Sequence, residues 1–331
     1  GAGDVDMRLF QAVDAGDLVA AQAAVADGAS VKAQDDDGEE PLYHACERGF
    51  LGIAQWLHGA GASVDAVDDD GGQTPLHSAC YGGHLNIVQW LHGAGASLDA
   101  YNTTADNMGG TPLRLACYNG HLRIAQWLHS MGAALNARDT LRNTLLHEAC
   151  LEGHLDLAQW LHSVGASIND TDTWGRTPLH RACSAGHLDV AQWLDSVGAS
   201  VNDTCAEVYT SGPALLSTTI VGHTPLHQAC MAGHLDIAQW LHSAGASVNA
   251  TTSEGWTPLH HVCSSARLEM TSWLCSVGAD VTAKDSKSFS PAHLLQRREP
   301  SILDKQAFRS AMDALLAAER RRAEECARAA E

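Results

Sequence analysis

One motif recurs along this chain at a nearly fixed spacing. Thr144–His162 read TLLHEACLEGHLDLAQWLH, and Thr177–Asp195 and Thr224–His242 carry the same pattern with few changes. A repeated motif of this size indicates one supersecondary unit that is copied along the chain and stacked on its neighbours. We therefore expect residues that recur in every unit to serve the unit itself, and we look for function among the residues that differ.

A leucine near the start of the motif gives the register of the units. Successive leucines lie 34, 37, 33, 33, 47 and 33 residues apart, so the basic period is 33 residues. Two of the steps add four and fourteen residues, and insertions in repeat proteins collect on the loops of one face, often the binding face. The leucines are Leu42, Leu76, Leu113, Leu146, Leu179, Leu226 and Leu259.

Each unit is predicted to form two short helices. Thr-Pro opens the first, because threonine can cap a helix and proline is tolerated at the first helical position. A Gly-His step, as at Gly186, breaks this helix, and Leu188, Ala191 and Leu194 follow at helical spacing in a second one. We expect Gly198 to end the second helix in the left-handed conformation.

The pattern of T-P-L-H, A-C, G-H-L and G-A-x-x-N resembles the ankyrin repeat, over about residues 4–295. The resemblance implies an all-α repeat, an α-solenoid whose helix-turn-helix units are joined by β-hairpin-like fingers. The expected domains are an N-terminal capping repeat at 1–39, seven ankyrin repeats at 40–289 with an insertion at about 203–223, a C-terminal capping repeat at 290–316, and a charged, alanine-rich helical tail at 317–331. The tail is predicted to be a solvated helix or, alternatively, a partner helix.

The net charge of the chain argues against some classes of binding partner. Twenty Lys and Arg against thirty-nine Asp and Glu give a net charge of −19, which argues against a broad nucleic-acid surface. No apolar run reaches the roughly 18 residues that span a membrane, and the first residues, GAGDVDMRLF, lack the pattern of a secretory leader. We expect a protein partner with a basic segment, and neither a nucleic acid nor a membrane.

Seven of the ten cysteines occupy the same place in their units. Stacked helices lie roughly 8–10 Å apart, whereas a disulfide needs Cα atoms within about 7 Å, so this column cannot bridge to itself. We interpret the seven as small buried apolar residues, which favours the cytoplasm or another reducing compartment. They are Cys46, Cys80, Cys117, Cys150, Cys183, Cys230 and Cys263.

The second helix of each unit departs from the common ankyrin pattern, because it carries A-Q-W-L-H. We interpret the resulting columns of tryptophan and histidine as a co-adapted part of the scaffold, in which tryptophan supplies bulk where alanine has removed it. The tryptophans are Trp56, Trp90, Trp127, Trp160, Trp193, Trp240 and Trp273, and the histidines are His58, His92, His129, His162 and His242.

Two sets of residues resemble a metal site and a catalytic site, and we interpret both as parts of the scaffold. Five first helices carry H-x-x-C, as at His180 and Cys183, but a structural zinc needs four ligands and the next pair lies a full repeat away. A cysteine nucleophile needs a nearby histidine and an electropositive setting, which an acidic protein with buried cysteines does not offer. Cys205, in the insertion, is expected to be an exposed loop thiol. We predict no enzyme, metal, cofactor or small-molecule substrate.

The family resemblance places partner binding on the concave surface, formed by the finger tips and the exposed side of the first helices. Residues at these positions vary between units, and Arg114 replaces the scaffold histidine of its unit, where it is predicted to direct its guanidinium toward the groove. Trp174 and Trp256 lie outside the tryptophan column and are either binding anchors or packing residues. The predicted partner-binding residues are Tyr81, Arg114, Tyr118, Leu151, Trp174, Arg181, Met231, Trp256, His261, Asp69, Asp70 and Tyr209.

The insertion at about 203–223 is the most distinctive segment. Val208–Thr210 and Ile220–Val221 are typical of strands, and Ser211–Pro213 carry a turn signal. We predict an elongated finger, with a mobile loop as the alternative.

These observations favour a non-enzymatic protein-protein interaction scaffold or adaptor. The alternative is a regulatory or targeting module of a larger enzyme or complex whose catalytic part lies outside this chain. A further possibility is that the protein is a substrate for asparaginyl hydroxylation, since four asparagines resemble those modified in other ankyrin repeats. These are Asn136, Asn169, Asn202 and Asn249.

Overall fold

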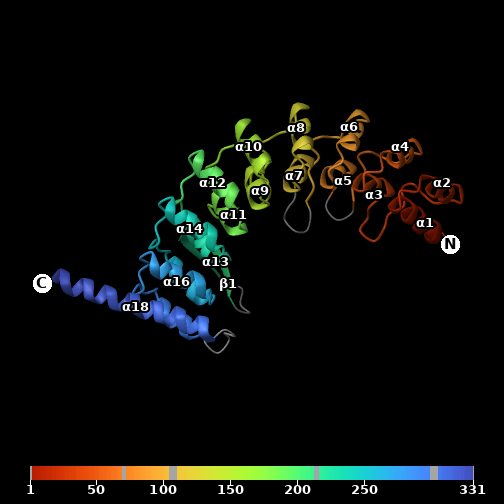
Figure 1. Cartoon of the computed structure of the whole chain (residues 1–331). Coiled ribbons are helices and arrows are strands. Elements are labelled where there is room, and N and C mark those ends of the chain that lie inside the picture. Colours follow the sequence, from red (N-terminus) through yellow and green to blue (C-terminus); the bar gives the residue numbers. More distant parts are fainter. Residues whose placement is uncertain (1, 69–71, 104–109, 212–215, 299–304, 331) are drawn as a thin grey trace. The chain divides into compact units, whose positions relative to one another are not determined.

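A computed structural model describes residues 2–68, 72–103, 110–211, 216–298 and 305–330 (Figure 1). The chain divides into two compact units, Gly1–Ala166 and Ser167–Glu331. Both are built from pairs of short antiparallel helices, so the predicted all-α repeat fold is confirmed. Within the described residues, no helix is both long and apolar enough to cross a lipid bilayer.

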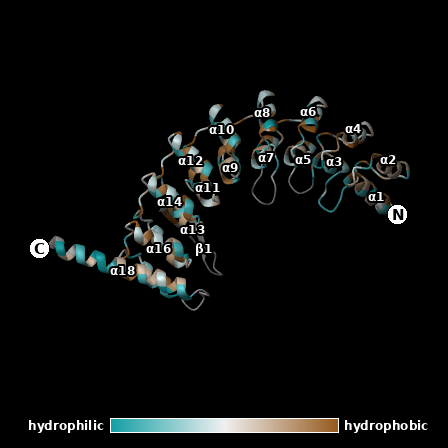
Figure 2. Ribbon diagram, viewed as in Figure 1, coloured by the Kyte–Doolittle hydropathy of each residue, from teal (hydrophilic) through white to brown (hydrophobic). Residues whose placement is uncertain are grey.

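The first unit consists of five helix pairs, and neighbouring first helices pack against one another, as α3 does on α5, α5 on α7 and α7 on α9. The loop between α2 and α3 is hydrophilic (Figure 2). The helices are α1 Ala2–Asp14, α2 Leu18–Ala26, α3 Pro41–Glu47, α4 Leu51–Gly59, α5 Pro75–Gly82, α6 Leu85–Gly93, α7 Pro112–Tyr118, α8 Leu122–Ser130, α9 Leu145–Leu151 and α10 Leu155–Ser163.

The second unit continues the same arrangement, with α11 packed on α13, α13 on α15 and α15 on α17. It adds a two-stranded antiparallel sheet and a long last helix. Its elements are α11 Pro178–Ala185, α12 Leu188–Ser196, β1 Cys205–Ser211, β2 Leu216–His223, α13 Pro225–Ala232, α14 Leu235–Ser243, α15 Pro258–Ser264, α16 Leu268–Ser276, α17 Pro291–Gln296 and α18 Lys305–Ala330.

The histidine of T-P-L-H closes the start of the first helix in the repeats that carry it. In α5, Nδ1 of His77 accepts from the backbone N–H of Thr74 at 3.1 Å, and Nε2 donates to the carbonyl of Gly110 in the next repeat at 3.1 Å. Burial lowers the pKa of His77 to about 4, so the imidazole is neutral. His180, His227 and His260 repeat these contacts in the second unit. Both ring nitrogens are therefore used by the scaffold.

The histidine of G-H-L has a second structural role. Nε2 of His84 donates to the carbonyl of Glu47 at 2.8 Å, and Nε2 of His234 does the same to Ser184 at 3.3 Å. Each ring lies against the glycine that ends the preceding first helix. A Cβ added to Gly186, for example, would lie 2.6 Å from Cε1 of His234. The glycine is thus required both for its left-handed backbone, φ 95°, and for this close approach.

The predicted cysteine column lies in the core. All seven of its thiols are fully buried, and burial raises their pKa well above the ordinary value. The expectation for Cys205 is wrong, because this residue is 4% exposed. It begins β1, where the next residue donates its N–H to the carbonyl of Trp174 at 2.7 Å, and Nε2 of Gln228 lies 3.6 Å from its sulfur.

The tryptophan and histidine columns of the second helices interlock. The rings of four of these histidines meet the tryptophan of the following repeat edge to face. The ring centroids lie 5.9 Å apart for His58 and Trp90, and 5.5 Å apart for His92 and Trp127. His129 with Trp160 and, in the second unit, His242 with Trp273 repeat the contact. These contacts confirm the interpretation of the two columns as one part of the scaffold.

The insertion forms the predicted finger, with longer strands than expected. β1 and β2 pair in antiparallel register, with Tyr209 opposite Thr218, and the turn residues 212–215 lie outside the described residues. The N–H of Ala206 bonds to the carbonyl of Trp174, and the N–H of Ser253 to that of Val221. These bonds attach the base of the hairpin to the fingers on either side of it.

The C-terminal end differs from the expected boundary at residues 316 and 317. α18 runs without a break from Lys305 to Ala330 and packs on α16. Phe308 and Leu315 are buried there, whereas Leu316 is 41% exposed. The cap and the charged tail are therefore parts of one helix.

Candidate interaction surface

Three predicted binding residues follow the buried cysteine in successive first helices of the first unit. Tyr81 is 49% exposed, and Tyr118 and Leu151 are partly exposed. The scaffold holds their backbones, because Nε2 of His121 donates to the carbonyl of Tyr81 at 3.0 Å and Nε2 of His154 donates to that of Tyr118 at 2.9 Å. These contacts hold the backbones of Tyr81 and Tyr118 and leave part of the surface of all three side chains exposed.

Arg114 does not direct its guanidinium toward a groove, and that expectation is wrong. The residue is 3% exposed, and its guanidinium lies 3.1 Å from Oε1 of Glu148 and 3.6 Å from Oδ2 of Asp139. Both carboxylates are buried as well. Arg114 therefore joins α7 to the next repeat. The pairing with Glu148 could have been predicted from the sequence, because Glu148 is an acidic residue about one repeat after an arginine that stands at a scaffold position.

Several of the acidic finger residues belong to the scaffold. Oδ1 of Asp68 accepts from the N–H groups of Gly72 and Gln73 at 2.8 and 2.9 Å, which closes the finger on itself. Asp69 and Asp70, predicted for partner binding, lie outside the described residues. The same finger contact occurs at Asp35, Asp139, Asp172 and Asp285.

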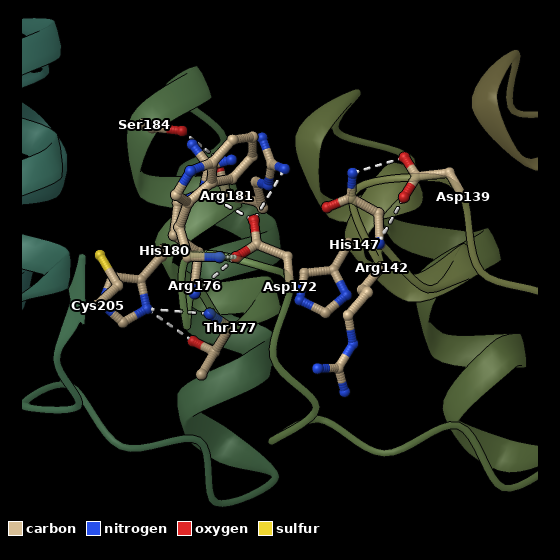
Figure 3. Close-up of polar contacts among 12 residues, drawn as sticks. Asp139, Arg142, His147, Asp172, Arg176, Thr177, His180, Arg181, Ser184 and Cys205 are labelled. Carbon is tan, nitrogen blue, oxygen red and sulfur yellow. Dashed lines mark hydrogen bonds and ion pairs between the residues drawn. The ribbon is translucent and has the colours of Figure 1, made fainter. Parts of the chain in front are cut away.

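In the second unit, Asp172, Arg176 and Arg181 form one charged cluster (Figure 3). Oδ2 of Asp172 lies 2.8 Å from Nε of Arg176 and 3.0 Å from the guanidinium of Arg181. Burial raises the pKa of Asp172, but hydrogen bonds and charge from Arg176 outweigh it and hold the pKa below its ordinary value. The guanidinium of Arg176 lies 4.3 Å from the ring centre of Trp174, which remains partly exposed.

The other predicted residues of the second unit come together. Met231, Trp256 and His261 all line one pocket of about 670 Å³. His261 is 6% exposed, so its expected exposure is wrong; the ring lies beneath Trp256, with ring centres 4.8 Å apart. Tyr209 lies in β1, and its side chain is outside the described residues.

A cluster around His44, at the start of the first full repeat, was not predicted from the sequence. Nδ1 of His44 lies 3.0 Å from Asp14, and Nε2 lies 2.9 Å from Asp35 and 3.6 Å from Glu39. Ligand atoms of Asp35, Glu39 and His44 lie within 4.8 Å of one another. Burial lowers the pKa of His44, but its hydrogen bonds to Asp14 and Asp35 raise it above the ordinary value. A protonated imidazole that donates from both nitrogens accounts for this arrangement as an ion-pair cluster.

Comparison with known proteins agrees with this architecture. The family model described as ankyrin repeats in three copies matches residues 9–102, 52–139 and 113–205, and the model for many copies matches residues 226–275. Together these matches cover well over half of the chain. A search of curated proteins gives no match. The buried columns, the fingers and the family matches lead to one conclusion: the chain belongs to the ankyrin repeat family.

Proposed function

We propose that this protein is a non-enzymatic scaffold or adaptor that binds a protein partner through the exposed side of its first helices and its finger tips. Ankyrin repeats are generally protein-protein interaction modules. One observation carries the proposal for this chain: Tyr81, Tyr118 and Leu151 share one register position in three successive first helices, α5, α7 and α9, and retain exposed surface. Aromatic side chains of this kind are enriched among the residues that contribute most to binding.

The charge of the first unit supports a partner with a basic segment. Residues 1–166 hold seven Lys and Arg against twenty-one Asp and Glu, whereas residues 167–331 hold thirteen against eighteen. The net charge of the first unit is therefore −14, and that of the second is −5. Such a field steers a basic partner and speeds its association, and added salt weakens the effect.

The test uses Tyr81→Ala and Tyr118→Ala, singly and together, in affinity capture with quantitative mass spectrometry, followed by titration of the captured partner in purified form. Because truncation of a central aromatic costs about 2 kcal/mol or more, each substitution is expected to weaken the affinity by roughly 30-fold. Association is also expected to slow as the ionic strength rises.

Met131 offers a matched control. It is 45% exposed, lies at the end of α8 in a second helix, and belongs to the same unit. Met131→Ala should leave the affinity unchanged. If the double tyrosine variant binds as tightly as the wild type, or if Met131→Ala weakens binding as much, the first helices do not form the binding face.

A further inference from the structure

The residue before each capping threonine changes character along the chain. In the second to fifth full repeats it is Gln73, Gly110, Asn143 or Arg176, and in the sixth it is His223. The last two positions hold Trp256 and Phe289. The carbonyls of His223, Trp256 and Phe289 accept a hydrogen bond from the scaffold histidine of the preceding repeat. Their backbones therefore belong to the scaffold, whereas their side chains differ from those of the earlier repeats.

Two of these rings form a wall of the pocket in the second unit. Besides Trp256 and Phe289, the pocket is lined by the apolar side chains of Ile220, Met231 and Leu294. Its volume of about 670 Å³ exceeds that of one large side chain. Ser264 and Ser265, at the end of α15, add polar groups.

Buried imidazoles adjoin the apolar lining. His223 and His261 both line the pocket, with ring centres 5.2 Å apart, and His227 lies 5.6 Å from His261 behind them. Burial, together with repulsion from the neighbouring imidazoles, lowers the pKa of His261 well below its ordinary value. His261 is therefore uncharged, and its buried Nε2 has no hydrogen-bond partner among the residues that the structure describes. A buried polar atom in this state is costly.

The charged groups of the lining are balanced and engaged within the protein. Oε2 of Glu254 accepts from the hydroxyl of Ser286 at 2.5 Å. Oδ1 of Asp285 accepts from the N–H groups of Lys287 and Phe289 at 2.9 and 2.7 Å. The guanidinium of Arg297 lies 5.4 Å from the ring centre of Phe289. Two acidic and two basic residues thus cancel, which leaves no net charge to match a charged occupant.

We propose that this pocket binds an uncharged aromatic side chain that carries a hydrogen-bonding group, a tyrosine or tryptophan of the protein partner. The inference rests on the proposed function, since it names the side chain that the face would hold. The rings of Trp256 and Phe289 stack on the occupant. A shift of the Trp256 ring, whose centre lies 4.8 Å from that of His261, opens Nε2 of His261 to the occupant, whose hydroxyl or indole N–H then supplies the hydrogen bond that His261 lacks. A charged side chain would lose its hydration without gaining a counter-charge.

The experiment uses the whole chain labelled with 5-fluorotryptophan, so that ¹⁹F NMR reports on Trp256, whose signal is assigned with Trp256→Phe. The probes are N-acetyl-tyrosinamide, N-acetyl-phenylalaninamide and N-acetyl-lysinamide. The tyrosine probe is expected to shift the Trp256 signal. The phenylalanine probe should bind about tenfold more weakly, because it lacks one hydrogen bond, and the lysine probe should cause no shift.

Two controls separate the pocket from the rest of the unit. The signal of Trp174, which does not line the pocket, should not respond to any probe. His261→Phe should reduce the affinity for the tyrosine probe to that for the phenylalanine probe, and the comparison of the two probes on the wild type holds even if this variant does not fold. Equal affinities for both, or a Trp256 signal that the tyrosine probe does not move, would overturn the inference. If the protein still captures its partner but the Trp256 signal does not respond to the tyrosine probe, the pocket proposal alone is wrong. The effect of Tyr81→Ala and Tyr118→Ala on partner capture tests the proposed function separately.

Discussion

Arg114 stands where other repeats carry the scaffold histidine, and its guanidinium lies between two buried carboxylates. Arg114→Met keeps most of the length of the side chain and removes the charge. Glu148 is 3% exposed, so it would be left as a buried carboxylate beside Asp139, which is 6% exposed. Removal of one partner from such a buried pair costs about 3–5 kcal/mol, because the remaining charge keeps its desolvation penalty and loses its counter-charge.

Double substitution identifies the source of this cost. In Arg114→Met with Glu148→Leu, most of the stability should return, since a buried ion pair replaced by apolar residues is often neutral or stabilising. Arg114→His restores the residue of the other repeats but not a permanent charge, and it should be destabilised as well. The matched control is Arg123→Met, an exposed arginine of the same unit, which should change the stability by no more than about 0.5 kcal/mol.

Urea unfolding followed by circular dichroism measures the overall cost. Because repeat arrays unfold in parts, hydrogen exchange of peptides from α7 and α9 measures it at the site. At 2–4 °C per kcal/mol for a unit of this size, the corresponding thermal transition should fall by roughly 6–20 °C. The buried ion pair is not the source of the cost if the free energy of unfolding of Arg114→Met lies within about 1 kcal/mol of the wild-type value. The same conclusion follows if the double variant loses as much stability as the two single variants lose together.

Three further predictions follow from the scaffold. After Cys326→Ser, thiol-specific dyes should label the native protein only at the rate of unfolding, because the described cysteines are buried; rapid labelling of the folded chain contradicts this. The hydrogen bonds of His44 to Asp14 and Asp35 hold its folded pKa above 6.5, so its ion pairs stabilise fully below the unfolded pKa and are lost as the pH rises through the folded pKa; the difference in stability between wild type and His44→Gln should therefore narrow as the pH rises above about 6.5, and a constant difference rules the ion pairs out. Gly186→Ala should cost about 1–3 kcal/mol more than Gly198→Ala, since both glycines have positive φ but only the first meets a ring, that of His234; equal costs in urea unfolding would show that this contact is unimportant.

The repeated framework was predictable because its determinants are local. Thr-Pro caps, Gly-His breaks and apolar spacing all act within one unit of 33 residues, and each is repeated often enough to be unmistakable. The buried cysteine column followed from the same register. Even the hairpin was predictable, because Val208–Thr210 and Ile220–Val221 alternate around a turn signal. The hydrogen bonds that attach the hairpin to Trp174 and Ser253 could not be predicted, since backbone hydrogen bonds between fingers do not depend on the pattern of side chains in the sequence.

The variable residues were harder to interpret, because exposure depends on what the next repeat places opposite them. Arg114 looks like a binding residue until Glu148, 34 residues away, is brought against it. His261 and Arg181 occupy the same position in their repeats. Arg181 is partly exposed there, whereas His261 is buried against the ring of Trp256. Asp68 looks like an acidic tip, but its carboxylate closes its own finger.

The repeat, its helix pairs, its caps and the residues of its core follow from the sequence alone, because short-range interactions and periodic burial specify them. Which variable side chains stay exposed depends on how the repeats stack. The tertiary structure pairs Arg114 with Glu148, leaves Tyr81 exposed, and brings Met231, Trp256 and His261 into one pocket. The physical reason is that stacking brings together residues a full repeat apart, where charge, ring contacts and desolvation depend on the neighbour and not on the local motif.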